Sequence, residues 1–207
     1  MFPLHAILDV DAAAGAGWDV AHLATAFLDG GARVIQLRAK QLSSAAFLEH
    51  ADALVRAAAT CGAVVIVNDR ADVARLAGAA GVHVGQEDLP PAAARGLLGP
   101  DAMVGYSTHT VAQIEAAVKE PVSYIAIGPV FGTSTKATGY DSVGLNLVAE
   151  AVRIARGVPV IAIGGITLEN ARQVIDAGAS GVAVISDLLA GGDPKGRVAA
   201  YLSVLGL

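Results

Sequence analysis

Short runs rich in valine and isoleucine recur eight times along the 207 residues, and this repetition limits the folds open to the chain. Each run has the length of one buried strand, and segments with the apolar spacing of helices separate them. The runs are LHAILDV (4–10), VIQLRA (34–39), VVIVND (64–69), GVHVGQ (81–86), MVGYST (103–108), YIAIGPV (124–130), PVIAIGG (159–165) and GVAVIS (181–186). Eight strands that alternate with helices predict an α/β fold of the (β/α)8, or TIM-barrel, type.

The length of the chain favours one such barrel and nothing more. A (β/α)8 barrel needs about 200 residues or more, so we expect a single domain over residues 1–207. The main alternative is an open doubly wound sheet. No GxGxxG motif follows the first run, which argues against a dinucleotide-binding version of that sheet.

The composition indicates a folded chain with an aliphatic core. Hydrophobic residues make up 54% of the sequence and aromatic residues only 4%, as suits a buried parallel sheet. The net charge is −5 and no basic stripe is present, so we expect no nucleic-acid partner. No apolar run reaches the length of a membrane span and no signal peptide precedes the first strand, so we expect a cytoplasmic protein.

Basic residues follow two of the predicted strands. In such barrels the chemistry is located at the carboxyl ends of the strands. Gln36, Arg38 and Lys40 alternate along one face of an extended segment, and Lys136 follows the sixth strand. Because arginine and lysine are the usual ligands of phosphate oxygens, these cations predict a site for an anion.

Two carboxylates, Asp69 and Asp88, end the neighbouring third and fourth strands. Mg²⁺ prefers one or two carboxylates together with substrate phosphates and water. The sequence therefore predicts a diphosphate that is bound by basic side chains and by Mg²⁺.

A second phosphate site is predicted after the last two strands. The segments GGI (164–166) and VISD (184–187) place backbone N–H groups next to helix starts, where many barrels of this kind bind phosphate. Two such sites imply two small phosphorylated ligands.

Each motif also has a purely structural explanation. The basic and acidic residues could form surface ion pairs, and Asn68 or Asp69 could cap the fourth helix. Thr108 or Thr110 could cap the helix after the fifth strand. His83 lies inside a strand, where a core histidine is the commoner case. The functional interpretation gains its weight from the convergence of all these groups on one face of the barrel.

Taken in order, the motifs resemble the thiamine-phosphate synthase family. The resemblance covers about residues 34–186 and rests on QLRAK (36–40), NDR (68–70), GVHVGQEDLP (81–90), STHT (107–110), GPVFGTSTK (128–136), IGGI (163–166) and VAVIS (182–186). It implies a (β/α)8 barrel and a transferase of thiamine biosynthesis. Such an enzyme joins a hydroxymethylpyrimidine diphosphate to a thiazole phosphate and releases diphosphate, with Mg²⁺ as cofactor.

The resemblance also implies roles for individual residues, with catalysis expected from Arg38, Ser107 and Lys136. The pyrimidine diphosphate would be bound by Gln36, Arg38, Lys40, Asn68, Ser107 and Lys136. The metal would be held by Asp69 and Asp88. The thiazole phosphate would be bound by Thr133, Thr135, Gly165, Ile185 and Ser186. Segment 131–144 would close over the site, and Asp9 is left without a role.

Three other functions compete with this one. A thiazole tautomerase on a related barrel would not need the residues that bind diphosphate. A Schiff-base aldolase would use Lys40 or Lys136 as its amine. A non-catalytic regulator would bind a phosphorylated ligand without turnover. The sequence leaves the oligomeric state open, including whether the chain forms a homo-oligomer.

Overall fold

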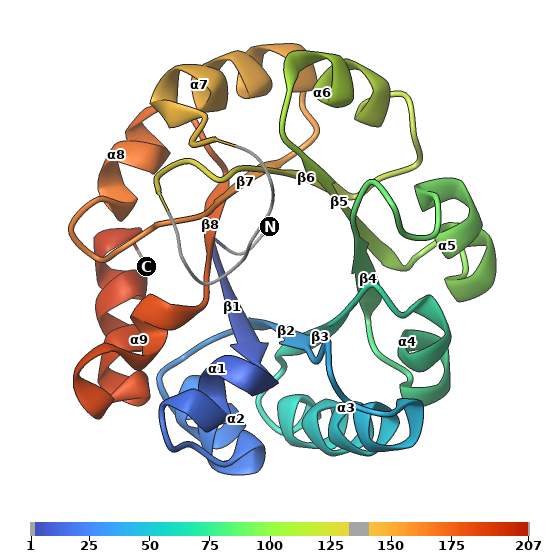
Figure 1. The fold of residues 1–207 in the computed structure, drawn as a ribbon, viewed down its shortest axis with the longest axis vertical. Helices are drawn as coiled ribbons and strands as arrows, with labels where there is room; N and C mark the ends of the chain where they lie inside the picture. The colour runs from blue at the N-terminus through green and yellow to red at the C-terminus, as the bar shows by residue number, and fades with distance from the viewer. Residues whose placement is uncertain (1–2, 133–140, 207) are drawn as a thin grey trace.

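The computed structural model describes residues 3–132 and 141–206, and within them eight parallel strands close into a barrel in chain order (Figure 1). The strands are β1 (Leu4–Asp9), β2 (Val34–Arg38), β3 (Val64–Asn68), β4 (Gly81–Val84), β5 (Met103–Thr108), β6 (Tyr124–Ile127), β7 (Val160–Ile163) and β8 (Gly181–Val184). β1 pairs with both β2 and β8, which closes the ring. The predicted (β/α)8 barrel is confirmed, and an open sheet is excluded.

Helices surround the ring of strands and cover its outer face (Figure 1). They are α1 (Val10–Gly15), α2 (Val20–Asp29), α3 (Ser44–Ala59), α4 (Ala71–Ala77), α5 (Pro91–Leu98), α6 (Val111–Ala117), α7 (Gly144–Ala155), α8 (Ala171–Asp176) and α9 (Pro194–Val204), with a 3-10 segment η1 (Ser186–Gly192) after β8. Among the described residues, no helix is both long enough and apolar enough to cross a membrane.

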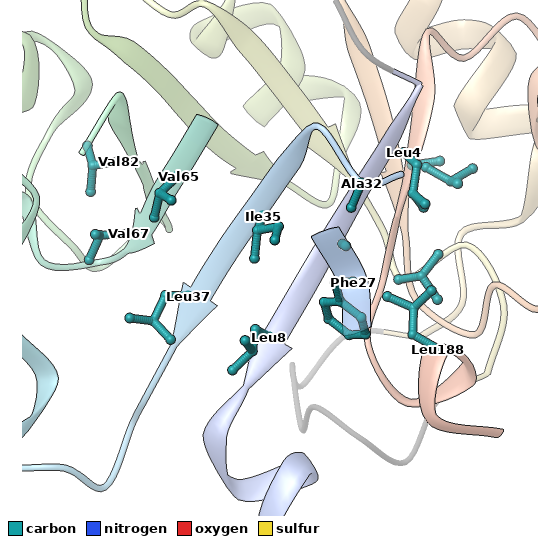
Figure 2. Packing of buried hydrophobic residues seen from close by; sticks show 14 of the residues in the cluster. Leu4, Leu8, Phe27, Ala32, Ile35, Leu37, Val65, Val67, Val82 and Leu188 are labelled. Atoms are coloured by element: carbon teal, nitrogen blue, oxygen red, sulfur yellow. The ribbon is translucent and has the colours of Figure 1, made fainter. Parts of the chain in front are cut away.

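The strand pleat divides the core into two parts. Alternate strand residues point outward, as Ile35 and Leu37 of β2 do, and Phe27 of α2 belongs to the same cluster (Figure 2). Their neighbours point into the barrel, where Ile66 and Ile161 belong to a separate inner cluster. Because the outer layer supplies most of the apolar packing, the inner face can carry polar side chains.

The helix starts decide between two explanations of the polar motifs. Thr110 caps α6, since its hydroxyl accepts a hydrogen bond from the backbone N–H of Gln113 at 3.2 Å. The cap position of α4 is Arg70, whose side chain makes no capping bond. The prediction that Asn68 or Asp69 caps this helix is therefore wrong, and both side chains can serve another purpose.

Candidate active site

A cavity of about 360 Å³ lies inside the barrel and is lined by residues from all the strands and from several loops that follow them. It brings together seven of the residues predicted to bind substrate: Gln36, Arg38, Asn68, Ser107, Gly165, Ile185 and Ser186. Lys40, Asp69 and Asp88 do not line it, but Asp69 directly follows the lining residue Asn68. Thr133, Thr135 and Lys136 lie outside the described residues, as does most of segment 131–144.

Arg38 is oriented by Asp9, the last residue of β1. The two residues are paired across β1 and β2, and Arg38 Nη1 donates to Asp9 Oδ2. Asp9 Oδ1 accepts from the backbone N–H of Ala12 at 2.9 Å, so one carboxylate both starts α1 and holds the guanidinium. Arg38 Nε is buried and has no hydrogen-bond partner among the residues described. Since Arg38 lines the cavity, an unused donor of this kind suits an anionic ligand.

Lys40, Asp69 and Asp88 form a charged group at the ends of β2, β3 and β4. Lys40 Nζ and Asp69 Oδ2 form an ion pair. The Asp88 carboxyl accepts from the backbone N–H of Gly85 at 2.7 Å. Partial burial raises the pKa of Asp88 above its ordinary value; the Gly85 bond opposes this rise, whereas a hydrogen bond and repulsion from Asp69 add to it. The two carboxylates are thus close enough to disturb each other.

This pair of carboxylates fits a hard divalent cation. Asp69 has a φ of 61°, an uncommon conformation for a residue with a side chain, and such strain is concentrated at functional sites. The described ranges contain no cluster of three or more His, Cys, Asp or Glu side chains that could hold a metal by themselves. Mg²⁺ with few protein ligands and several phosphate oxygens matches a site of this composition.

A buried chain of hydrogen bonds below the cavity mouth was not predicted from the sequence. His83 Nε2 lies 2.8 Å from Ser107 Oγ, and His83 Nδ1 lies 3.0 Å from the hydroxyl of Tyr124. Gly105 makes room for them, because a Cβ there would lie 2.3 Å from the Tyr124 hydroxyl oxygen. His83 is therefore a cavity residue and orients Ser107. The alternation along β4 contained a signal for this position. Val82 and Val84 face the helices, so His83 between them faces the inside of the barrel.

His5 also lines the cavity, deep in the barrel on β1. Its exposed fraction is 1%, and neither ring nitrogen has a partner within the described part of the chain. The ring lies edge-on to Tyr124, with 5.1 Å between the ring centroids. Burial lowers the pKa of His5 from 6.5 to about 4, so the imidazole is neutral at neutral pH.

The loops after β7 and β8 present mainly backbone groups to the cavity. The ends of β2, β3 and β4, by contrast, carry charged side chains. Gly164 and Gly165 have φ values of 98° and 63°, which favour glycine. A Cβ on Gly165 would lie 2.5 Å from the carbonyl oxygen of Gly132, so the close approach of two loops also requires glycine. Ile185 and Ser186 follow β8 and line the same cavity.

Together these features define a (β/α)8-barrel protein whose cavity lies between a group of charged side chains and a pair of glycine-containing backbone loops. Comparison with known proteins gives the family. The family model described as thiamine monophosphate synthase matches residues 5–188, and the chain belongs to this family. The family resemblance predicted from the motifs is confirmed.

Individual relatives agree with the family match. A thiamine-phosphate synthase of Koribacter versatilis is 47% identical over 184 residues, which cover 89% of this chain and 85% of the relative. One from Shouchella clausii is 42% identical over 189 residues, covering 91% of this chain and 90% of the relative. The solved structure of thiamine phosphate pyrophosphorylase from Pyrococcus furiosus has a TM-score of 0.88 and 29% identity, covering 99% of this chain and 95% of that one.

Proposed function

We propose that the protein is a thiamine-phosphate synthase, a transferase that joins 4-amino-2-methyl-5-(diphosphooxymethyl)pyrimidine to 4-methyl-5-(2-phosphoethyl)thiazole and releases diphosphate. Family membership supports this activity. The cavity is the observation that links this activity to particular residues of the chain. Arg38, with an unpaired buried donor, and the loop at Gly165 line one cavity, so two anionic groups can be bound on opposite sides of one reaction space.

The pyrimidine diphosphate belongs on the side of β2 to β5. Gln36 and Asn68 are buried and line the cavity there, and their amides can bond to the nitrogens of the pyrimidine ring. Arg38 and Lys40 offer positive charge to the diphosphate, and Ser107, oriented by His83, offers a hydroxyl. The thiazole phosphate belongs on the other side, at Gly165, Ile185 and Ser186.

The reaction needs charge stabilisation more than acid or base catalysis. The bond between the methylene carbon and the diphosphate oxygen breaks, and its electron pair leaves with the diphosphate. The thiazole nitrogen then donates its lone pair to the pyrimidine-stabilised cation and forms the new C–N bond. Arg38 and Lys40 lower the barrier by meeting the charge that develops on the leaving group. Water would quench the cation, so a cavity that excludes water favours the reaction.

Asp69 and Asp88 would hold Mg²⁺ at the edge of this site. The metal, when bound, supplies positive charge to the diphosphate oxygens. Lys40, now paired with Asp69, would exchange that partner for a phosphate oxygen. A Lys40 engaged in an ion pair gives no support to the aldolase alternative, because a Schiff base requires a free neutral amine.

The roles of Thr133, Thr135 and Lys136 rest on the sequence alone. We infer that the two hydroxyls bind the thiazole phosphate and that Lys136 meets the departing diphosphate. A cytoplasmic location also remains an expectation from the sequence.

The test is a direct assay with both substrates and Mg²⁺, in which thiamine phosphate and diphosphate are measured by chromatography. We expect equal amounts of both products, and omission of either substrate should abolish them. Isomerisation of a thiazole phosphate without condensation would identify a tautomerase. Tight binding of both substrates without product would identify a regulator, and borohydride trapping of a carbonyl compound would identify an aldolase.

A further inference from the structure

The carboxylate of Asp187 ties three segments together behind the loops after β7 and β8. It lies in η1 and accepts a hydrogen bond from the backbone N–H of Leu168, in the loop after β7, at 3.1 Å. Arg197 of α9 donates to it through Nη2 at 2.9 Å and 3.0 Å and through Nε at 3.2 Å. The hydroxyl of Tyr201, also on α9, donates to the same carboxylate. Nothing in the proposed reaction uses this residue.

Helix α9 holds the loop after β7 at further points. The fully buried Tyr201 hydroxyl lies 3.4 Å from the carbonyl oxygen of Ile166. Arg197 Nη2 lies 3.8 Å from a carboxylate oxygen of Glu169. The loop is therefore fixed from behind by the bond from the Leu168 N–H to Asp187, and Tyr201 and Arg197 of α9 lie beside Ile166 and Glu169.

The carbonyl groups of Gly164 and Gly165 in this loop are already bonded within the protein. The carbonyl of Gly164 accepts from the N–H of Phe131 at 3.0 Å, and that of Gly165 accepts from Asn170 Nδ2 at 3.0 Å. The carbonyl of Ile166 faces Tyr201. The backbone N–H groups of Gly165 and Ile166, by contrast, have no hydrogen-bond partner in the regions that the structure describes. Since both residues line the cavity, the loop presents donors to it.

The charge of Asp187 does not oppose an anion here, although Asp187 itself lines the cavity. Its ion pair with Arg197 balances the carboxylate, and only 14% of the Asp187 side chain is exposed. The network therefore sets the geometry of the loops without presenting a bare negative charge to the ligand.

We propose that Asp187 is a positioning residue for the thiazole phosphate: it holds the loops after β7 and β8 so that the N–H groups of Gly165 and Ile166 bind the phosphate group. The identity of the ligand rests on the proposed function, whereas the role of Asp187 in binding a phosphate group does not. A positioning residue on this side of the cavity changes the affinity for one substrate and leaves the other unaffected.

The test compares Asp187→Asn with wild type in steady-state kinetics for both substrates. We expect KM for the thiazole phosphate to rise roughly tenfold, the loss that follows when a hydrogen bond to a charged group is weakened. KM for the pyrimidine diphosphate should stay within about twofold. The matched control is Asp176→Asn, which removes an exposed ion pair with Arg172 on α8 and should change neither constant. Equal increases in both KM values, or no increase, would overturn the proposal.

Binding of inorganic phosphate, measured by NMR titration, separates this inference from the proposed function. Wild type should bind phosphate more tightly than Asp187→Asn, whether or not it makes thiamine phosphate. Equal affinity in the two proteins, or no binding by wild type, would overturn the positioning role. If Asp187→Asn does not fold, Tyr201→Phe removes one donor and keeps the carboxylate. It should raise KM for the thiazole phosphate selectively, by about twofold to fivefold, and an unchanged KM would contradict the proposal.

Discussion

Around the mouth of the barrel, the ends of β2, β3 and β4 differ from the ends of β7 and β8 in how they meet a ligand. The first set, called here the side-chain half, consists of Arg38, Lys40, Asp69 and Asp88. The second, the backbone half, consists of the loops that contain Gly165 and Asp187. Positive potential comes from formal charges in one half and from peptide N–H groups in the other.

The difference determines what each half must do when a ligand binds. In the side-chain half the cations are already paired, Arg38 with Asp9 and Lys40 with Asp69. A diphosphate and a metal ion would replace some of these partners. In the backbone half the donors at Gly165 and Ile166 need no rearrangement, because the carbonyls are already bonded elsewhere. Loss of Arg38, Lys40, Asp69 or Asp88 should therefore affect the first half, and changes that shift the loop backbone should affect the second.

The largest effect is expected for Arg38→Ala in the side-chain half. Loss of one preorganised group that stabilises charge in the transition state costs about 10²–10³ in rate. kcat/KM should fall by that factor, and KM for the thiazole phosphate should change little. Arg153→Ala, which removes an exposed arginine paired with Glu150 on α7, is the control. If Arg38→Ala mainly raised KM for the thiazole phosphate, the division into two halves would be wrong. Thermal melting should accompany the kinetics, since the substitution leaves Asp9 unpaired.

A second prediction concerns β1, the strand between the two halves. The pKa of His5 is lowered from 6.5 in the unfolded chain to about 4 in the fold, so the unfolded state binds more protons between these pH values. The free energy of unfolding should therefore fall as the pH drops from about 6.5 to 4, by up to about 3 kcal/mol. In urea titrations at several pH values, His5→Phe should reduce this fall in the free energy of unfolding. His22→Phe, at an exposed site, should keep it. An identical pH slope in wild type and His5→Phe would contradict the assignment.

In the backbone half, Gly165→Ala should raise KM for the thiazole phosphate roughly thirtyfold. An alanine at a φ of 63° costs about 1–2 kcal/mol, and its Cβ would also lie 2.8 Å from Phe131 Cβ. Gly62→Ala is a matched control, because Gly62 has a φ of 68° but open space around it. KM for the pyrimidine diphosphate should be unaffected by either substitution. A comparable loss of affinity for both substrates in Gly165→Ala would show that the loops do not act separately.

The sequence predicted the side-chain half better than the backbone half, for a physical reason. Period-two alternation determines which strand residues share a face, so the pattern alone predicts that Gln36 and Arg38 point the same way, and both line the cavity. Charged residues at the ends of adjacent parallel strands must also lie near one another, which brought Asp69 and Asp88 together.

Partners that depend on the packing of distant segments could not be predicted. Asp9 had no role in the sequence because its bond to Arg38 requires the pairing of β1 with β2. Asp187 was noticed only as part of a motif, since its contacts come from where α9 packs against η1. His83 was predicted to be a core residue, and only the structure shows it bonded to Ser107 at the cavity.

The smallest effect is expected for Asp88→Asn, which tests whether the carboxylates of the side-chain half hold a metal. The substitution keeps the shape of the side chain but removes a negative charge beside Asp69. Mg²⁺ should bind roughly tenfold more weakly, a loss of the size that even outer-shell partners of a metal cause. Calorimetric titration of Mg²⁺ in the presence of diphosphate measures this directly, and the Mg²⁺ dependence of product formation should shift in parallel.

Asp101→Asn, at an exposed position before β5, serves as the control. Because Asp69 and Asp88 belong to the side-chain half, KM for the thiazole phosphate at saturating Mg²⁺ should stay at the wild-type value. If Mg²⁺ titrations of Asp88→Asn and wild type superimpose, Asp69 and Asp88 serve only to balance Lys40, and the side-chain half binds the diphosphate through its cations alone.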